Sequence, residues 1–193
     1  QKRQTDREHV IAGLVRIAAP KVLRPVLMPV FTTLAQRHQA LQLDLRFSDQ
    51  IADVVDEQID VGVRIGSVRD NSFIARTVAQ VGLYLTASPS LLATYGKPAD
   101  LEQLALMPVT QLMDKATGRP WHWYFKDGVL WSPKRSSFIV DDAEAEVEAT
   151  LAGLGVSQLA SYSAIPHIRT GALVRLLPEL EPKAWPLSVY RPQ

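Results

Sequence analysis

The chain has 193 residues, of which 47% are hydrophobic and 21% charged, an ordinary composition for a globular protein with a substantial core. Its formal net charge is +1, which argues against a phosphate-binding surface formed by these residues, because such surfaces carry a clear basic excess. Since the chain contains no cysteine, disulfides, thiolate metal sites and cysteine nucleophiles are excluded.

No targeting or membrane segment is predicted. No apolar run approaches the roughly 18 residues that a membrane-spanning helix needs. The first residues, QKRQTDREHV, are polar and lack the apolar stretch of a signal peptide. We therefore expect a cytoplasmic protein without a membrane partner.

The first third of the chain alternates between strand and helix patterns. Strands are predicted at residues 13–20, 41–47 and 60–66. A helix at residues 22–39 separates the first two strands, and a second helix, capped by Ser48 or Asp49, separates the last two. Pro29 falls inside the first helical stretch and should kink it or mark its start. This order and spacing predict a parallel sheet with right-handed crossovers.

The middle of the chain repeats the pattern. Residues 81–87 alternate as a strand. Ser88 then caps a helix that has Pro89 at its first position and ends at Gly96. Further on, an Asp-Gly pair separates two aromatic-rich runs in FKDGVLW, which predicts a hairpin.

The clearest helix of the second half is DDAEAEVEATLAGLG, residues 141–155. Asp141 or Asp142 caps it and Gly155 closes it. Acidic residues fill its first turns, where the helix dipole favours them, and we interpret them as a solvated face. The predicted buried stripe comprises Ala143, Val147, Leu151 and Leu154. Strands over 155–161 and at LSVY follow.

The repeated pattern predicts two lobes with a cleft between them. No Pro-rich or Gly-rich linker separates the two halves. Continuous strands should therefore join the lobes, and the candidates are residues 81–87 and 155–161.

Arg64 stands out in strand 60–66, because Gly62 and Gly66 lie on the same predicted face. Ligands of open parallel sheets lie just beyond the carboxyl ends of the strands. One interpretation is that Arg64, or the backbone of Gly66 and Ser67, faces an anionic ligand. The alternative is that Arg64 pairs with a carboxylate and joins neighbouring segments. Asp60 is not the obvious partner, since four residues of strand span roughly 13 Å.

Four segments occur in an order and at distances typical of a known family: IDVGVRIG, TASPSLLATYGKP, AGLGVSQL and GALVRLLP. Together they resemble the effector-binding domain of LysR-type transcriptional regulators. The resemblance extends from about residue 13 to the end of the sequence. It depends on the ordered set, since no single motif is decisive.

The resemblance implies an α/β fold of two Rossmann-like lobes, of the periplasmic-binding-protein type II, joined by two crossover strands. Residues 13–85 and 162–193 would form lobe I, residues 86–161 lobe II, and residues 1–12 the end of a linker helix. A winged helix-turn-helix that binds promoter DNA would lie upstream. The family also usually continues past LSVYRP, so we expect a fragment that contains the sensing half.

The resemblance also implies two kinds of partner. The first is a small-molecule effector in the cleft, often a carboxylate or an aromatic metabolite, whose binding would favour one arrangement of the lobes. The second is another copy of the chain, in a homodimer or homotetramer. Domains of this family pair side by side and antiparallel, which makes residues 31–38 and strand 41–47 a candidate interface. A solvated surface is the alternative for these residues.

The effector site implied by the family lies at strand ends. The turn into the first helix offers free backbone N–H groups and the helix dipole to an anion. Many relatives carry a serine or threonine in this turn, whereas this chain has Lys21, which suggests a charge contact or else an ordinary solvated lysine. The predicted effector-binding residues are Pro20, Lys21, Val22, Arg64, Gly66, Ser67, Thr110, Gln111, Val156, Ser157 and Gln158.

We predict no catalytic residue, metal site or cofactor. The histidines are scattered without metal-ligand spacing, and no nucleophile-elbow motif occurs. The face formed by Trp121, Trp123 and Phe125 is interpreted as lobe core and not as an aromatic ligand box.

Two other functions use the same scaffold. A solute-binding protein of a transporter would need a signal peptide upstream, and the charged first residues argue against one. An enzyme would show turnover, or acid and base groups with shifted pKa values in the cleft. A ligand-sensing regulator domain is the leading hypothesis, and it leaves the effector and the target genes open.

Overall fold

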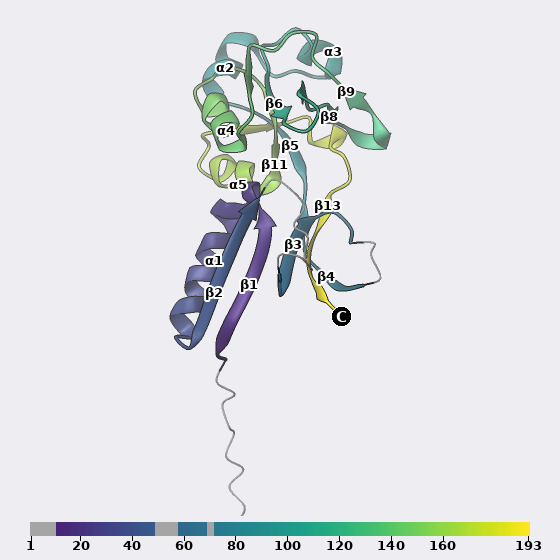
Figure 1. The fold of residues 1–193 in the computed structure, drawn as a ribbon. Helices are drawn as coiled ribbons and strands as arrows, with labels where there is room; N and C mark the ends of the chain where they lie inside the picture. Colours follow the sequence, from purple (N-terminus) through teal and green to yellow (C-terminus); the bar gives the residue numbers. More distant parts are fainter. Residues whose placement is uncertain (1–10, 49–57, 69–71) are drawn as a thin grey trace, which may run out of the picture. The chain divides into compact units, whose positions relative to one another are not determined.

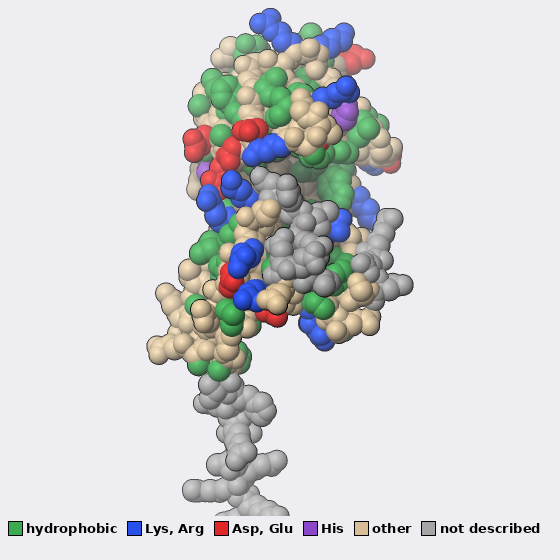
Figure 2. Space-filling view, in the orientation of Figure 1, with side chains coloured by type: hydrophobic (Ala, Val, Ile, Leu, Met, Phe, Trp, Pro, Cys, Tyr) green, Lys and Arg blue, Asp and Glu red, His purple; other side chains and the backbone are tan. Residues whose placement is uncertain are grey.

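The computed structural model describes residues 11–48, 58–68 and 72–193 (Figure 1, Figure 2). The predicted end of a linker helix and the predicted helix after Ser48 fall largely outside these ranges. The described residues form two compact units: unit 1 runs up to Ala79 and includes Pro186–Gln193, and unit 2 is Gln80–Trp185 (Figure 1). The predicted lobes divide the chain at 85/86 and 161/162 instead. The difference arises mainly because β12 (Val174–Leu176) pairs with β5 (Leu83–Ala87) and so lies in unit 2.

The strand and helix pattern predicted for the first third is confirmed wherever the structure describes it. The elements of unit 1 are β1 (Gly13–Pro20), the 3-10 turn η1 (Lys21–Leu23), α1 (Arg24–Arg37), β2 (Leu41–Ser48), β3 (Val61–Ile65), β4 (Phe73–Val81) and β13 (Trp185–Pro192). Strand β4 was not predicted, because nearly all of its side chains are exposed and it lacks a buried alternating face.

These strands form one mixed sheet in the order β2-β1-β3-β13-β4. Strand β1 runs parallel to both β2 and β3, whereas β13 runs antiparallel to β3. The chain therefore passes from β1 to β2 on one side and returns to β3 on the other side of β1. Such a reversal of strand order is a topological switch point, the place where open α/β sheets bind ligands.

Helix α1 continues through Pro29, which lies inside it. Two threonine hydroxyls bond back to main-chain carbonyls here: Thr32 Oγ1 donates to Met28 O at 2.9 Å, and Thr33 Oγ1 donates to Pro29 O at 2.8 Å. Pro29 has no backbone N–H and so cannot donate a hydrogen bond within the helix, and these two bonds add contacts around it. The helix buries Phe31, so this member of the predicted interface faces the interior of unit 1.

The second unit is built around three short sheets. Its elements are β5 (Leu83–Ala87), α2 (Pro89–Tyr95), α3 (Leu101–Leu104), β6 (Thr110–Asp114), β7 (Arg119–Pro120), β8 (Trp123–Tyr124), η2 (Lys126–Gly128), β9 (Leu130–Trp131), β10 (Phe138–Val140), α4 (Ala143–Leu151), β11 (Ser157–Ala160), α5 (Ser161–Arg169), β12 (Val174–Leu176) and η3 (Pro178–Leu180). The sheet orders are β10-β6-β7, β11-β5-β12 and β8-β9. The predicted crossover segments thus become the neighbouring antiparallel strands β5 and β11.

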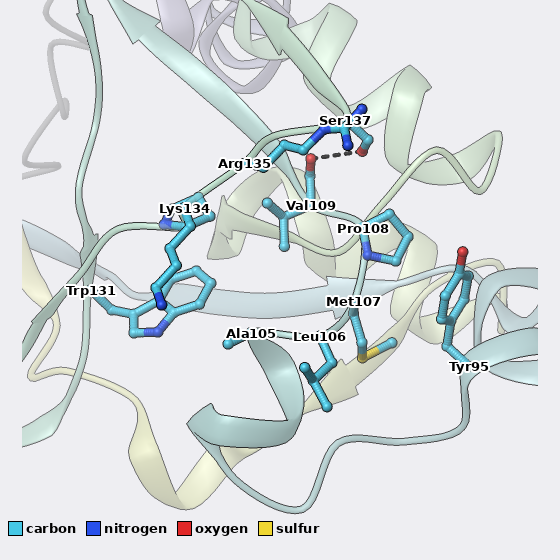
Figure 3. Close-up of a pocket in the computed structure, with 11 residues that line it drawn as sticks. Tyr95, Ala105, Leu106, Met107, Pro108, Val109, Trp131, Lys134, Arg135 and Ser137 are labelled. Carbon is cyan, nitrogen blue, oxygen red and sulfur yellow. Dashed lines mark hydrogen bonds between the residues drawn. The ribbon is translucent and has the colours of Figure 1, made fainter.

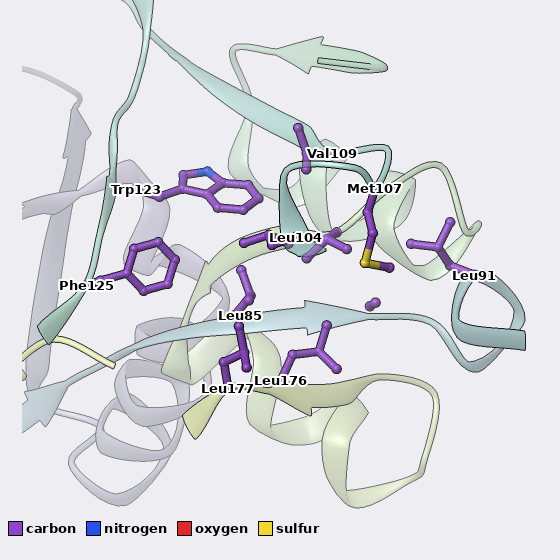
Figure 4. Packing of buried hydrophobic residues seen from close by; sticks show 11 residues of the cluster. Leu85, Leu91, Leu104, Met107, Val109, Trp123, Phe125, Leu176 and Leu177 are labelled. Carbon is purple, nitrogen blue, oxygen red and sulfur yellow. The ribbon is translucent and has the colours of Figure 1, made fainter. Parts of the chain in front are cut away.

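An apolar cluster of unit 2 joins β5, α2, α3, β8, β9, β12 and η3, and Figure 4 shows part of it. Leu85 of β5, Leu104 of α3 and Val109 lie at its centre and are almost fully buried. Trp123 and Phe125 pack into it, which confirms the core interpretation for two of the three aromatic residues. Trp121 is 45% exposed, so the prediction for it is wrong. Its backbone instead extends the edge of a sheet, since Trp121 N donates to Leu112 O at 2.8 Å.

Caps and turns largely follow the sequence. Ser88 Oγ accepts from Leu91 N, and Asp142 Oδ1 accepts from Ala145 N, as their predicted N-cap positions require. The Asp-Gly pair forms the turn of the β8–β9 hairpin, with positive φ at Asp127 and Gly128. The residue with left-handed geometry after α4 is Gly153, not the predicted Gly155. Helix α5 was not predicted.

No helix in the part of the chain that the structure describes has the length and apolar character that a membrane span requires.

The glycine at 62 is explained by a long-range contact inside unit 1. A Cβ atom at this position would lie 2.2 Å from Cζ of Tyr190, because the tyrosine ring rests directly on the glycine backbone. Tyr190 is buried, and its ring meets Phe73 edge-on with 5.4 Å between the centroids. The space beside Arg64 that the sequence suggested at Gly62 is therefore filled by an aromatic ring from β13.

Replacing Gly62 with alanine should lower the free energy of unfolding by about 1–3 kcal/mol, because the new methyl group displaces the Tyr190 ring. The same change in a Tyr190→Ala background should cost little, since the obstructing ring is gone. Urea unfolding of the four members of this double-mutant cycle measures the coupling. Equal effects of G62A in both backgrounds would show that the ring contact is not the reason for the glycine.

Candidate functional site

The structure brings two of the predicted segments together at one edge of unit 1. β1 and β3 are parallel neighbours with Ile17 opposite Val61 and Ala18 opposite Gly62. Their carboxyl ends, which lead into Pro20–Val22 and Arg64–Ser67, therefore meet at the same edge of the sheet. This edge contains the switch point between β1 and β3.

Two cations flank this edge. Lys21 and Arg64 are both exposed, and neither forms an ion pair or side-chain hydrogen bond with another residue in the described ranges. The alternative interpretation of Arg64, a structural pair with a carboxylate, therefore finds no partner among the described residues. Asp60 has a different role, since its Oδ2 accepts from Arg16 N at 2.8 Å and so joins β3 to β1.

The turn into α1 at this edge has no side-chain cap. Neither Pro20, which precedes the 3-10 turn, nor Leu23, which precedes α1, caps the following helix with its side chain. The first amide groups of a helix have no intrahelical acceptor, and the helix dipole makes their surroundings favourable for an anion. Val22 is partly exposed in the same turn.

The loop after Arg64 is held by strand β13. Gly66 has φ of +109°, a conformation that other residues rarely adopt. Its N–H donates to Pro186 O at 2.7 Å, and its carbonyl accepts from Ser188 Oγ at 3.2 Å. Ser67 follows and is exposed. The position of the Gly66–Ser67 backbone is thus fixed by residues far away in the sequence.

The predicted residues of unit 2 are also neighbours, but most of their side chains are occupied internally. Thr110 N donates to Val156 O at 2.8 Å, which joins β6 to the start of β11. The side chains of Thr110 and Ser157 are fully buried. Thr110 Oγ1 donates to Glu146 Oε1 at 3.3 Å, and Ser157 Oγ lies 2.6 Å from Thr150 Oγ1.

The two predicted glutamines hold neighbouring segments. Gln158 makes two bonds to the backbone of Tyr124, accepting from its N–H at 2.9 Å and donating to its carbonyl at 2.7 Å. The buried Gln111 donates to Trp121 O at 3.2 Å and accepts from Ser136 Oγ. A ligand that bonded to either amide would have to replace these contacts, each worth about 1 kcal/mol or more when lost.

Sequence analysis missed the most unusual group of unit 2. Glu146 belongs to the acidic run that we interpreted as a solvated face, yet it is only 3% exposed. Burial raises its pKa from 4.5 to about 7, and the hydrogen bond from Thr110 opposes this shift. Together with Thr86, Thr110, Thr150 and Ser157, Glu146 forms what we call the buried polar cluster.

The prediction of the buried stripe of α4 is wrong in part for the same reason. The helix buries Glu146, Ala149 and Thr150, whereas Leu154 is 43% exposed. Val147 and Leu151 pack at the side, against the cluster around Leu159. The small side chains of Ala149 and Thr150 let α4 approach the strands closely. This pair of small residues is the feature of the sequence that indicates a buried face.

No three His, Asp or Glu side chains gather as a metal site within residues 11–48, 58–68 and 72–193.

Comparisons with known proteins place this geometry in a family. The family model described as the LysR substrate binding domain matches residues 9–193. An HTH-type transcriptional repressor of Pseudomonas aeruginosa (strain UCBPP-PA14) is 29% identical over 178 residues, covering 89% of this chain and 55% of the repressor. The chain spans between 55% and 62% of the length of the curated relatives that it matches first.

Solved structures of regulatory domains have the same fold. The regulatory domain of AphB from Vibrio vulnificus, treated with cumene hydroperoxide, superimposes with a TM-score of 0.82 at 20% identity, covering 94% of this chain and 90% of that one. The regulatory domain of CrgA from Neisseria meningitidis gives a TM-score of 0.79 at 21% identity, with 95% and 90% covered. The predicted periplasmic-binding-protein type II fold is thereby confirmed.

Glu146 should make the stability of the chain depend on pH. Because its pKa is raised in the folded state, the unfolded chain loses this proton first, so stability falls as pH rises from 4.5 to about 7 and then levels off. The loss is on the order of 3 kcal/mol. Glu146→Gln should remove it, and urea unfolding between pH 4 and pH 8 measures the difference.

The matched control is Glu148→Gln, an exposed glutamate two residues along the same helix. This variant should keep the pH dependence of the parent. If E146Q retains that dependence as well, the carboxyl of Glu146 is not the group that titrates.

Proposed function

The chain belongs to the family of LysR substrate binding domains, and from this premise we propose that it senses a small anionic or aromatic effector for a LysR-type transcriptional regulator. The proposed effector-binding residues are those predicted from the sequence, in both units. The observation that supports this most strongly is the edge of unit 1 at the switch point. There, two exposed cations, Lys21 and Arg64, have no carboxylate partner among the described residues, and the turn into α1 has no side-chain cap.

We propose different roles for the two units in binding. Lys21, Arg64 and Ser67 are exposed and would contact the effector directly. The buried Thr110 and Ser157 would instead hold the strand ends of unit 2 in position, with their backbone as the contact surface. A small carboxylate suits this division, because Arg and Lys recognise carboxylates by charge-assisted hydrogen bonds.

The role of the whole protein is a further part of the proposal. The relatives are named transcriptional regulators, so we propose that promoter DNA is bound by a helix-turn-helix outside this sequence, in the cytoplasm. The relatives do not favour the alternative of a solute-binding protein for a transporter. We propose that the domain binds its effector without chemical turnover.

We also propose that the domain works as a homodimer or homotetramer through α1. Val26 and Val30 lie four residues apart on α1 and are 38% and 58% exposed, and Val22 of the preceding turn η1, which is 38% exposed, continues this apolar stripe. The partner surface would be in unit 2, where the edge strand β10 exposes Phe138 and Ile139.

A thermal-shift screen of small carboxylates should identify ligands of this domain. At about 100 times its dissociation constant a ligand adds ~2.7 kcal/mol, which raises the melting temperature by several degrees. Lys21→Ala and Arg64→Gln should each lower the affinity for an identified ligand by about tenfold or more, because each removes a charged hydrogen bond. Calorimetric titration of the parent and the variants measures this loss.

Arg76→Gln is the matched control, since this exposed arginine lies on β4 at the far edge of the same sheet. It should leave the affinity unchanged. A hit that binds both site variants as tightly as the parent would place the effector elsewhere.

A charge on the stripe of α1 should dissociate the oligomer. Val30→Glu places a carboxylate in the proposed interface and should weaken self-association by roughly 30-fold or more. Val78→Glu is its control, because Val78 is 53% exposed on β4, away from α1. Sedimentation velocity over a concentration series measures both. Equal dissociation constants for V30E and the parent would rule out this surface.

A further inference from the structure

Unit 2 contains a cavity of about 470 Å³ that none of the predicted effector-binding residues lines (Figure 3). One wall is the turn after α3, with Leu106 and Met107, and the opposite wall is the segment from Trp131 to Ser137. Tyr95, at the end of α2, borders it beside Met107. This volume lies within the 300–1,000 Å³ that is typical of small-molecule sites.

Hydrogen bonds fix both walls, so the cavity is formed before any ligand arrives. In the turn after α3, Leu106 N donates to Gln103 O at 3.1 Å, and Met107 N donates to Leu104 O at 3.0 Å. On the other wall, Ser137 Oγ donates to Val109 O at 2.8 Å and to Leu154 O at 2.9 Å. A preformed site binds without the entropic cost of ordering its walls.

The lining has two chemical characters. Leu106 is 82% exposed and Tyr95 is 53% exposed, which is unusual for large apolar side chains next to a concave surface. The charged residues of the lining are Lys134 and Arg135, and none of the described residues that line the cavity is acidic. Neither cation forms an ion pair with another residue in the described ranges.

The cavity lies at the opposite end of its strands from the unit 1 part of the proposed effector site, which is at the carboxyl ends of β1 and β3. In unit 2, Thr110 and Gln111 begin β6 directly after the lining residue Val109. β6 and β10 are parallel, with Phe138 opposite Thr110. The lining residues Val109 and Ser137 precede these two strands, so the cavity is at their amino ends. Ligands of open α/β sheets bind at carboxyl ends, so the switch-point argument does not account for this cavity.

We propose that this cavity is a second ligand site, which takes a small amphipathic carboxylate with an aliphatic or aromatic body. The apolar body covers Leu106, Met107 and the indole of Trp131. The carboxylate is held by Arg135 and Lys134 at the rim. The site lies within unit 2 alone, and neither Lys21 nor Arg64 lines it, so substitutions at these two residues separate it from the effector site proposed above.

Octanoate is a suitable probe, and 1-octanol is its neutral counterpart with the same chain. We expect octanoate to bind the 193-residue chain with one-to-one stoichiometry by calorimetry. It should also change tryptophan emission, through Trp131. A Lys134→Gln/Arg135→Gln double variant should bind octanoate at least about tenfold more weakly, with octanol unaffected.

Leu106→Glu should also weaken octanoate at least about tenfold, because it places a like charge in the site without disturbing the core. Trp131→Phe should remove the emission change and keep the affinity. Lys126→Gln, an exposed cation of the same unit outside the cavity, and Lys21→Ala in unit 1 should bind octanoate like the parent.

Three results would overturn the proposal. The first is the absence of octanoate binding at millimolar concentration. The second is octanoate binding to L106E and to the double variant as tightly as to the parent, or octanol binding as tightly as octanoate. The third is self-association of the chain that L106E abolishes, which would make the cavity part of an interface between copies.

Discussion

Unit 1 depends on the contact between Gly62 and Tyr190. The chain leaves this unit after Ala79 and returns only at Pro186, so its sheet is completed by a strand more than a hundred residues later. The close approach of the ring to the glycine lets β13 pair with β3. The same pairing places Ser188 and Pro186 against Gly66, and so sets the geometry of the proposed effector-binding edge.

Unit 2 depends on a different interaction, the buried polar cluster around Glu146. A carboxyl group removed from water favours its protonated form, and Glu146 bonds to hydroxyls and pairs with no cation among the described residues. The hydroxyls join α4 to β6, β11 and β5, because Thr110, Ser157 and Thr86 belong to these strands. Polar contacts of this kind have fixed geometry, so they hold the strand ends of unit 2 in one register.

Features that depend on local periodicity and on turn residues can be predicted from the sequence. β1, β2 and β3, the caps of α2 and α4, and the β8–β9 hairpin follow from alternation and turn residues. Trp121 and Glu146 were assigned incorrectly, since their burial depends on which element packs over them and not on their neighbours in sequence. The unit 1 part of the candidate site was predictable, because switch points follow from strand order. The internal bonding of Gln111, Gln158 and Ser157 was not, because it depends on partners brought together by the fold.

This difference between the units has a consequence for recognition. In unit 1 the candidate cations Lys21 and Arg64 form no ion pair with another described residue, whereas in unit 2 the side chains of Gln158 and Ser157 are already bonded to the protein. Charge would then determine that the effector is an anion, and the rigid strand ends of unit 2 would select its shape. Substitution of an exposed residue such as Lys21 would then change which ligand the domain prefers, while the buried hydroxyls and amides of unit 2 remain in place for folding. The specificity of such a domain can therefore diverge without loss of its stability.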